Sequence, residues 1–431
     1  MRRVVAWIAR FASRLLFRRV EVAGIERYPD GRPVLLVANQ FNGFVDPVLI
    51  ATALGRLPRF IAKSELKKIP VAGLVLRSVG VVFVHRRGKG EGDPSGSLGN
   101  QDAFVDCHRA LAEGDVVAIF PEGTTHDRAQ IDPIKTGAAR IALGARTAGA
   151  EDLVILPVGL TFPDKVALRS SALVHFGLPI DLEVVAPGAV GADDAEAVRR
   201  LTATIDSGIR AVSPDFPDVE TSLALDQAAQ VALSGPDDPD PSLEARASLA
   251  RRLGRAAPEG QAAVRRDIGR YLTTLSGLQL TDADVVAPTN PRRLLRSAFW
   301  IAVLVFALGG LVAATALVNV WPAALVIVVS LLVKTPVSKG TARVVVGLIA
   351  FPTAWITFGV LAAEGVPQVI ALAITAALGA LAAIWMLERA IALAWMLLRW
   401  QAQRERIGTV GLATAVRADV VNTVRSVAGP S

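Results

Sequence analysis

The sequence has 431 residues, a length typical of two or three domains rather than one. It carries 46 Lys and Arg against 39 Asp and Glu, a net charge of +7, and 52% of its residues are apolar. A basic chain with a hydrophobic C-terminal end favours anionic lipid over nucleic acid as a partner, and no nucleic-acid recognition signature is present. Cys107 is the only cysteine, which excludes an internal disulfide and a cysteine metal cluster.

The first 19 residues mix arginines with large apolar side chains. On a helical wheel Arg3, Arg10 and Arg14 fall close together, and most of the large apolar residues cluster to one side. Arg10 and Arg14 interrupt the unbroken apolar stretch, roughly 7–15 residues, that a signal peptide needs. Residues 1–19 are therefore predicted to form an amphipathic helix on an anionic membrane surface. A helix packed on its own domain is the competing interpretation.

Residues 20–190 alternate short Val-rich runs, bounded by Gly, Asp or Pro, with helical patterns. Because the runs are apolar on both faces, they predict an α/β fold with a mostly parallel sheet flanked by helices. The predicted strands are 34–39, 79–86, 115–120, 153–162 and 172–177, and the predicted helices are 49–57, 102–114 and 135–149. Ligands of such sheets bind beyond the carboxyl ends of the strands, so polar residues there are candidates for chemistry.

Residues 191–296 are rich in Ala, Arg and Asp and predict a helical linker region with an acidic loop at 234–242. Residues 297–400 are strongly apolar and predict a membrane domain of about four helices in two hairpins, followed by a tail at 401–431. A spanning helix needs about 20 apolar residues. The candidate spans are 298–318, 319–333, 343–362 and 367–387, with a break at Trp321-Pro322.

Lys and Arg flank these spans but are absent from the two hairpin tips, 317–322 and 363–366. The positive-inside rule then predicts that both tips face outward and that the domain at residues 20–190 faces the cytoplasm. Hairpins that dip into one leaflet are the competing interpretation. A transporter-like role for the spans is disfavoured, because they contain almost no ionisable residue away from their ends.

Three polar stretches follow predicted strands. NQFNGFVDP (39–47) contains Gln40 and Asp46, FVHRRGKG (83–90) contains Arg86, and FPEGTTHDRAQIDPIKTG (120–137) contains Glu122 and Lys135. Cations beside a glycine and a helix N-terminus are suited to receive a phosphate group. The pattern G-x-x-x-x-G-K-[ST] is missing, which argues against a nucleotide-binding P-loop.

Together with ILPVGLTF (155–162), these stretches resemble the four ordered motifs of the glycerophospholipid acyltransferase superfamily: N-H-x4-5-D, a strand ending in Arg, F-P-E-G and V-P-V/I-G. The extended third motif looks most like the fungal glycerol 3-phosphate acyltransferase branch, which also has membrane segments after the catalytic domain. The resemblance covers residues 20–190 closely. It implies the glycerolipid acyltransferase fold and transfer of a fatty acyl group to glycerol 3-phosphate, lysophosphatidate or a related acceptor. Acyl-CoA or acyl carrier protein would be the co-substrate, with no metal and no other cofactor.

The resemblance also implies that the His of motif one is the general base and that the Asp orients it. Here Asp46 stands at the Asp position, and the His position is Gln40 in the H-x5-D spacing of the fungal-like branch or Phe41 in the H-x4-D spacing, neither of which can act as a base. An amide cannot accept a proton near neutral pH. Three interpretations compete. Catalysis persists through substrate positioning and another base, for which His126 and Asp46 are candidates; or the chain is a catalytically impaired lipid-binding or regulatory relative; or Gln40 is an engineered change.

The remaining site residues are implied to bind the substrate. Arg86, with Lys135 nearby, would hold the acceptor phosphate, and Arg128 would replace an Arg that many relatives carry two residues after F-P-E-G. Glu122 would hold an acceptor hydroxyl or brace the cations. The implied substrate-binding set is Arg86, Glu122, Gly123, His126, Arg128 and Lys135. The expected partners are membrane lipid and the acyl donor, and the oligomeric state is left open.

Overall fold

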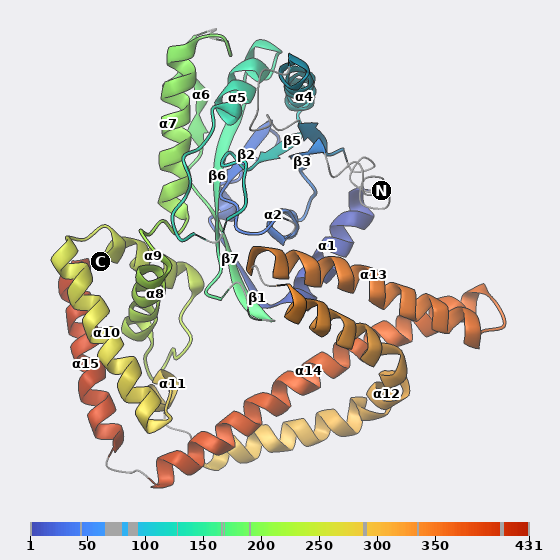
Figure 1. Ribbon diagram of the computed structural model, residues 1–431, viewed down its shortest axis with the longest axis vertical. Helices are drawn as coiled ribbons and strands as arrows, with labels where there is room; N and C mark the ends of the chain where they lie inside the picture. The colour runs from blue at the N-terminus through green and yellow to red at the C-terminus, as the bar shows by residue number, and fades with distance from the viewer. Residues whose placement is uncertain are drawn as a thin grey trace. The chain divides into compact units, whose positions relative to one another are not determined.

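The computed structural model describes residues 2–43, 45–64, 80–84, 94–126, 128–164, 167, 169–188, 191–287, 291–333, 336–405 and 409–429. The chain divides into two compact units, Met1–Val219 and Glu220–Ser431 (Figure 1). We call the first the sheet unit and the second the helical unit, and each is described by itself.

The sheet unit alternates strands and helices. Its strands are β1 (Phe17–Ala23), β2 (Val34–Ala38), β3 (Arg59–Lys63), β4 (Val82–Val84), β5 (Val116–Ile119), β6 (Val154–Thr161), β7 (Ser170–Phe176) and β8 (Ile180–Asp181). Its helices are α1 (Arg2–Leu16), the short 3-10 helix η1 (Ile25–Arg27), α2 (Val45–Leu54), α4 (Pro94–Ala112), α5 (Gly137–Thr147), α6 (Leu182–Val185) and α7 (Ala195–Val212).

The strands form one sheet in the order β1-β7-β6-β2-β5-β3-β4, with β8 also pairing with β6. Strands β2, β3, β4, β5 and β6 are mutually parallel. β7 is antiparallel to β6, and β1 runs parallel to β7. The prediction of an α/β fold with a mostly parallel sheet is confirmed.

The core of the sheet unit is built on strands that are buried on both faces. Every residue of β2 is buried, and Leu35 and Val37 belong to a cluster that includes residues of α4, α5 and α7. Helix α7 presents Val198, Leu201 and Ile205 to this cluster, a three- and four-residue spacing that makes one apolar helix face.

The predicted boundary at residue 190 is therefore too early, because the sheet unit continues through α7. Two glycines permit the close contact between α7 and β6. A Cβ at Gly159 would lie 2.1 Å from the Val212 carbonyl oxygen, and one at Gly208 would lie 2.8 Å from the Pro157 ring. Sequence composition could not reveal this packing, since α7 has the alanine- and arginine-rich composition of the following helices.

Helix α1 packs on its own unit through small side chains. Ala6, Ala9 and Ser13 are buried, and Arg10 donates a hydrogen bond of 3.0 Å to the Gly55 carbonyl oxygen. Arg14 stays exposed. The helix ends at Leu16, three residues earlier than predicted, because β1 begins at Phe17. Its binding to a membrane surface remains a prediction.

The helical unit contains α8 (Val219–Leu233), α9 (Leu243–Gly254), α10 (Pro258–Leu278), α11 (Asp282–Val286) and α15 (Thr409–Ala428). Helix α15 packs on α9 and α10 (Figure 1). Arg417 of α15 donates to Asp282 at 2.8 Å and to the carbonyl oxygens of Val231 and Ser234 at 2.7 Å each. Residues predicted as a linker and a tail thus fold against each other as a helical bundle.

Three further helices, α12 (Pro291–Leu332), α13 (Pro336–Ala362) and α14 (Val366–Glu405), are long and apolar enough to span a membrane. The break predicted at Trp321-Pro322 is wrong as a break in secondary structure, because α12 continues through Pro322. A proline removes one backbone hydrogen bond, and such a helix is usually kinked rather than ended where neighbouring helices support it.

Figure 1 shows α12 turning back on itself, and the contacts agree. Residues of α12 contact α14 in the pairs Thr315–Gly379 and Asn319–Ala376. Residues of α12 contact α13 in the pairs Asn319–Trp355, Val326–Gly347 and Ser330–Arg343. The pairs with α14 show that α12 before residue 319 is antiparallel to α14. The pairs with α13 show that α12 after residue 319 is antiparallel to α13. Since α13 and α14 are antiparallel to each other, α12 must reverse its direction near Pro322.

Candidate active site

The site lies where parallel strands β2, β5 and β6 end at one edge of the sheet. Asn39, the residue after β2, ties this edge together: its side-chain amide donates to the Leu160 carbonyl oxygen at 3.1 Å, and the Leu160 N–H donates back to Asn39 Oδ1 at 2.7 Å. The stretch 39–47 after β2 and the stretch 120–137 after β5 are therefore neighbours in space.

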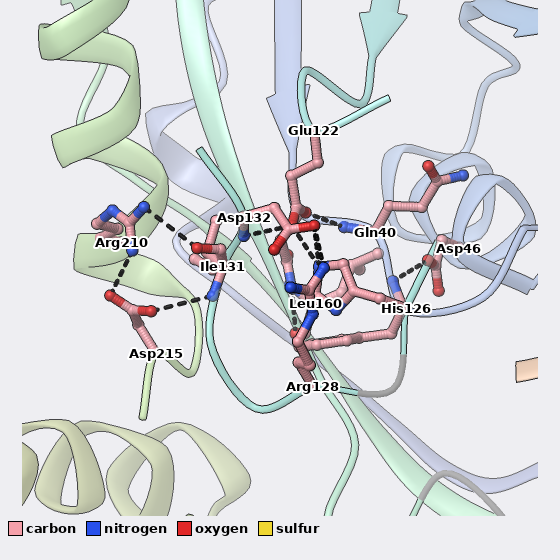
Figure 2. A network of polar contacts seen from close by, with 12 residues as sticks. Gln40, Asp46, Glu122, His126, Arg128, Ile131, Asp132, Leu160, Arg210 and Asp215 are labelled. Carbon is pink, nitrogen blue, oxygen red and sulfur yellow. Dashed lines mark hydrogen bonds and ion pairs between the residues drawn. The ribbon is translucent and has the colours of Figure 1, made fainter. Parts of the chain in front are cut away.

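Glu122 joins these two stretches through its carboxylate (Figure 2). Oε1 accepts a hydrogen bond of 2.9 Å from the Gln40 backbone N–H. Oε2 lies 2.7 Å from His126 Nε2 and accepts from the Asp132 backbone N–H at 3.0 Å. Glu122 is 3% exposed, and several donors around a buried carboxylate offset its loss of hydration. Glu122 therefore fixes the shape of the site.

Asp46 fixes the turn that follows Gln40. It lies in the first turn of α2, it is 0% exposed, and its Oδ2 accepts hydrogen bonds from the backbone N–H groups of Phe41 at 2.8 Å and Asn42 at 2.6 Å. A carboxylate is favourable at a helix N-terminus, where the helix dipole is positive. The sequence N-Q-F-N-G-F-V-D thus closes into a turn held by its last residue. Figure 2 shows the side-chain amide of Gln40 pointing away from Glu122.

His126 is held on one side of its ring only. Its side chain is 9% exposed, and the Phe41 ring packs on it edge to face with 6.4 Å between the ring centroids. Nε2 faces Glu122, and Asp132 Oδ2 lies 3.8 Å away. Nδ1 is buried and has no hydrogen-bond partner among the described residues. Because the carboxylates near Nε2 are acceptors, we assign the proton to Nε2.

The loop that carries Asp132 is clamped by the end of α7 (Figure 2). The Ile131 N–H donates to Asp215 Oδ1 at 3.0 Å, and Arg210 donates to the Ile131 carbonyl oxygen at 3.3 Å. Hydrogen bonds to Asp206 and Asp215 raise the pKa of Arg210 above its already high value. Sequence reasoning missed this clamp, and no local signal in residues 191–219 would have revealed it.

Gly123 and Lys135 lie against each other beside the start of α5. Gly123 has φ +68°, and a Cβ on it would lie 2.5 Å from Lys135 Nζ. The Lys135 N–H donates to the Pro121 carbonyl oxygen at 2.9 Å, which holds the two segments together. Lys135 is exposed and lies two residues before α5, so an accessible cation stands beside a helix N-terminus. Arg128 is also exposed and forms an ion pair with Asp132.

The structure thus gathers most of the predicted site residues at one sheet edge. Gln40, Glu122, His126 and Asp132 share direct hydrogen bonds, and Asp46 holds the adjoining turn. Arg86 lies outside the described residues, beyond the end of β4 at Val84. The predicted set that the structure describes is Gln40, Asp46, Glu122, Gly123, His126, Arg128 and Lys135.

Comparison with known proteins identifies relatives of residues within the sheet unit. Residues 19–161 match the family model described as Acyltransferase. The chain is 35% identical over 118 residues to glycerol-3-phosphate O-acyltransferase 1 of Saccharomyces cerevisiae, which covers 27% of this chain and 16% of that protein. It is 31% identical over 164 residues to the lyso-ornithine lipid O-acyltransferase of Brucella abortus, and this match covers 37% of this chain and 56% of that protein.

The chain therefore spans less than two thirds of the length of these curated relatives. A solved structure of the 1-acyl-sn-glycerophosphate acyltransferase of Thermotoga maritima is 24% identical, with 48% of this chain and 78% of that chain covered and a TM-score of 0.35. The matched residues contain the turn at Gln40 and Asp46, the Glu122 network and strand β6. Through residues 19–161, the chain is similar to the acyltransferase family of the glycerophospholipid acyltransferase superfamily.

Proposed function

We propose that the protein is a membrane-bound acyltransferase of phospholipid synthesis. It moves a fatty acyl group from acyl-CoA, or acyl carrier protein, to glycerol 3-phosphate, lysophosphatidate or a related acceptor. The observation that carries the proposal is the bridge from Glu122 to Gln40 and His126, because it joins two family motifs into one site. Relatives named as glycerol-3-phosphate and 1-acyl-sn-glycerol-3-phosphate acyltransferases support the substrate class.

The acceptor's phosphate group would bind at the cationic side of this site. Lys135 is exposed beside Gly123, and the backbone N–H groups at the start of α5 lie two residues further along. A dianionic phosphate is stabilised both by an ammonium group and by a helix N-terminus. Arg86 and Arg128 are proposed as further phosphate contacts, Arg128 by leaving Asp132 for the ligand.

The reaction is a direct displacement at a thioester. The acceptor hydroxyl attacks the thioester carbonyl carbon, the C–S bond breaks, and the products are an ester and a free thiol. The protein contributes by holding the two substrates in an orientation suited to attack, which in favourable cases supplies about 7–11 kcal/mol of the barrier. Two networks at the site, around Glu122 and around Asp46, keep its backbone rigid for this purpose.

A second candidate is a catalytically impaired relative that binds lipid on the same fold. The observation that favours it is Gln40 at the position of the family's histidine. Loss of a positioned acid or base typically costs about 10²–10⁴-fold in rate. Under this alternative, Gln40→His should create activity that the native chain lacks.

Purified full-length protein in detergent, given labelled acyl-CoA, distinguishes the two functions. We expect the native chain to acylate at least one of glycerol 3-phosphate, lysophosphatidate and dihydroxyacetone phosphate, and not glycerol, which lacks the phosphate. Asp46→Ala should abolish turnover because the turn at 41–42 loses two hydrogen bonds. A silent native chain with an active Gln40→His variant would support the impaired relative. If the native chain, Asp46→Ala and Gln40→His were all inactive, the assumption that this chain has an acyltransferase site, which both candidate functions share, would be contradicted.

We also propose that the helical unit enters the membrane from one side and returns to it. Arg399, near the end of α14, donates to Thr281 Oγ1 at 3.5 Å and lies 3.8 Å from Asp284, just before the start of α12. The reversal within α12 divides the path into four antiparallel segments, and an even number of such segments brings both ends of the path to the same side. The Lys- and Arg-rich ends then favour the cytoplasmic side, together with the catalytic domain.

Cysteine labelling in intact cells tests this topology, since native Cys107 is buried. A membrane-impermeant maleimide should label Gly365→Cys, at the exposed tip between α13 and α14, and should label Ser426→Cys on α15 only after lysis. Labelling of Ser426→Cys in intact cells would contradict a cytoplasmic C-terminal helix.

A further inference from the structure

We propose that His126 is the general base of this chain and that Glu122 orients it. The inference rests on the proposed acyltransferase function and names the group that would replace the missing motif-one histidine. His126 Nδ1 would take the proton from the acceptor hydroxyl.

The hydrogen bonds of His126 leave its basic nitrogen available. Nε2 is 2.7 Å from Glu122 Oε2, and carboxylates can only accept when ionised, so Nε2 carries the proton. The neutral ring then has its lone pair on Nδ1, which has no partner among the described residues although the side chain is more than nine-tenths buried. A histidine fixed by a carboxylate on one nitrogen and open on the other is the arrangement of an oriented base.

His126 also stands next to the position that lost its base. The two oxygens of Glu122 hold the Gln40 backbone N–H and the His126 ring, so a single carboxylate separates them. The other carboxylates of the site are placed less well. Glu122 already accepts three hydrogen bonds, and Asp46 is fully buried and accepts from two backbone amides with one oxygen.

The proposed step balances without a further reactant. Nδ1 takes the hydroxyl proton as the acceptor oxygen forms its bond to the thioester carbon, and the C–S bond then breaks. The imidazolium that forms is stabilised by Glu122 at 2.7 Å and by Asp132 at 3.8 Å. It returns the proton to the leaving sulfur, which yields the free thiol and restores the neutral ring.

Access to Nδ1 requires a local movement. In the absence of ligand Nδ1 is shielded from solvent, and the Phe41 ring lies edge-on against His126. Asp46 holds the backbone of the turn that carries Phe41, so a rotation of the Phe41 side chain on acceptor binding is the simplest way to open Nδ1. Catalytic hydrogen bonds often form only in the substrate complex.

Two substitutions at position 126 separate a base from a structural brace. His126→Gln places an amide donor near the position of Nε2, so it keeps a donor for Glu122 but removes Nδ1. His126→Asn places its amide near Nδ1 and gives up the bond to Glu122. A brace would tolerate His126→Gln and not His126→Asn. We expect both variants to lose about 10²–10⁴-fold in kcat, with the KM for the acceptor changed less than about threefold for His126→Gln.

The matched control is His108→Gln on α4, outside the site, which should keep native kcat. In the native chain, kcat should rise with pH as the general base loses its proton. In His126→Gln this rise should be absent. The charged groups that face His126 are Glu122 and Asp132, and Arg128 pairs with Asp132. A His126→Gln variant with more than about one third of native kcat would overturn the proposal.

A second readout does not depend on turnover. Nitrogen-15 NMR of labelled histidine in the full-length protein distinguishes the two neutral tautomers, and His126→Gln assigns the signal. We expect the neutral ring to carry its proton on Nε2 and none on Nδ1. A proton on Nδ1 with Nε2 bare would overturn the assignment of Nδ1 as base. Native protein without turnover, but with the expected tautomer, would instead place the failure in the proposed function.

Discussion

The two units of this protein bury opposite kinds of side chain. In the sheet unit the branched apolar residues are inside, and Leu36 in β2 is 0% exposed. In the long helices of the helical unit the large apolar residues are outside, and Phe306 and Leu317 are 92% and 90% exposed. Many of the buried positions there are small or polar, as at Ala354, Ala376 and Thr315, beside a few larger residues such as Leu304 and Val318. The exposed apolar side chains of α12, α13 and α14 fit helices that are long and apolar enough to span a membrane, because lipid accepts exposed apolar side chains and leaves small residues to pack between helices.

The two units also satisfy their buried polar groups differently. In the sheet unit, Asp46 and Glu122 are ionisable and are surrounded by backbone N–H donors. In the apolar helices, neutral Asn319 donates to the Ala376 carbonyl oxygen at 3.0 Å and accepts from Trp355 at 2.9 Å. A charge would be costly within lipid, so neutral polar groups link those helices, and the charged groups that could do chemistry are kept in the sheet unit.

The largest effect is expected from Gly159→Ala in the sheet unit. A Cβ there would lie 2.1 Å from the Val212 carbonyl oxygen, and backbone cannot move aside as a flexible side chain could. We expect a loss of about 3 kcal/mol in the free energy of unfolding. Hydrogen exchange by mass spectrometry should show lower protection in β6 and α7 and no change in α13. Gly191→Ala, whose Cβ would make an ordinary contact of 3.5 Å with Thr147, is the control.

Glu122→Gln should have the next largest effect. The amide group replaces one acceptor oxygen of Glu122 with a donor. This donor would face either the Gln40 N–H or the N–H groups of His126 and Asp132. The expected loss is about 2 kcal/mol of unfolding free energy, together with most of the transferase activity. Chemical denaturation and the acylation assay measure the two effects. Exposed Glu151→Gln should be neutral, and a fully active Glu122→Gln variant would show that the network is dispensable.

Asn319→Leu should affect the helical unit alone. It removes both hydrogen bonds that link α12 to α13 and α14, and polar links of this kind contribute about 1 kcal/mol. Tryptophan fluorescence during thermal unfolding in detergent should report a lower transition temperature. Thr375→Val on the exposed face of α14 is the matched control. Destabilisation of the sheet unit by Asn319→Leu would contradict the division into two units.

The smallest effect is expected in the pH dependence of the stability of the sheet unit, to which His108 contributes. Burial lowers the pKa of His108 below its usual value of 6.5, and its Nε2 is buried without a partner among the described residues. The unfolded chain then binds more protons than the folded one, so stability falls as the pH drops below about 6.5. Comparing unfolding at pH 7.5 and 5.5 should show a smaller fall in His108→Gln than in the native chain. An equal fall would assign the dependence to other groups.

Much of the sheet unit follows from local sequence. Val-rich runs bounded by turn residues correctly place β2, β5 and β6, because a strand buried on both faces must be apolar throughout. Strand β1 was not predicted, since Arg18 and Arg19 hide the pattern of an edge strand. The reversed direction of β7 was also unforeseen, because a strand sequence does not encode whether its neighbour runs parallel.

The site divides in the same way. The spacing of the motifs is enough to place Gln40 and Glu122 just beyond strand ends and Asp46 in the segment that follows β2. The spacing does not reveal that Asp46 would hold the 41–42 turn, or that Glu122 would hold Gln40 by its backbone. Those partners are backbone groups, which every residue carries, so no side-chain pattern marks them. Arg210 and Asp215 reach the site loop from more than 75 residues away.

By itself the sequence determined the class of sheet, the long apolar helices of the C-terminal region and the resemblance of residues 20–190 to acyltransferases, because these depend on composition and on short-range order. Only the tertiary structure decided that α7 belongs to the sheet unit, that α12 reverses at its proline while remaining helical, and that His126 has one nitrogen held and the other open. The first two depend on contacts between residues far apart in the chain, and the third depends on how the loop from Glu122 to Asp132 folds, so their geometry exists only once the chain has folded.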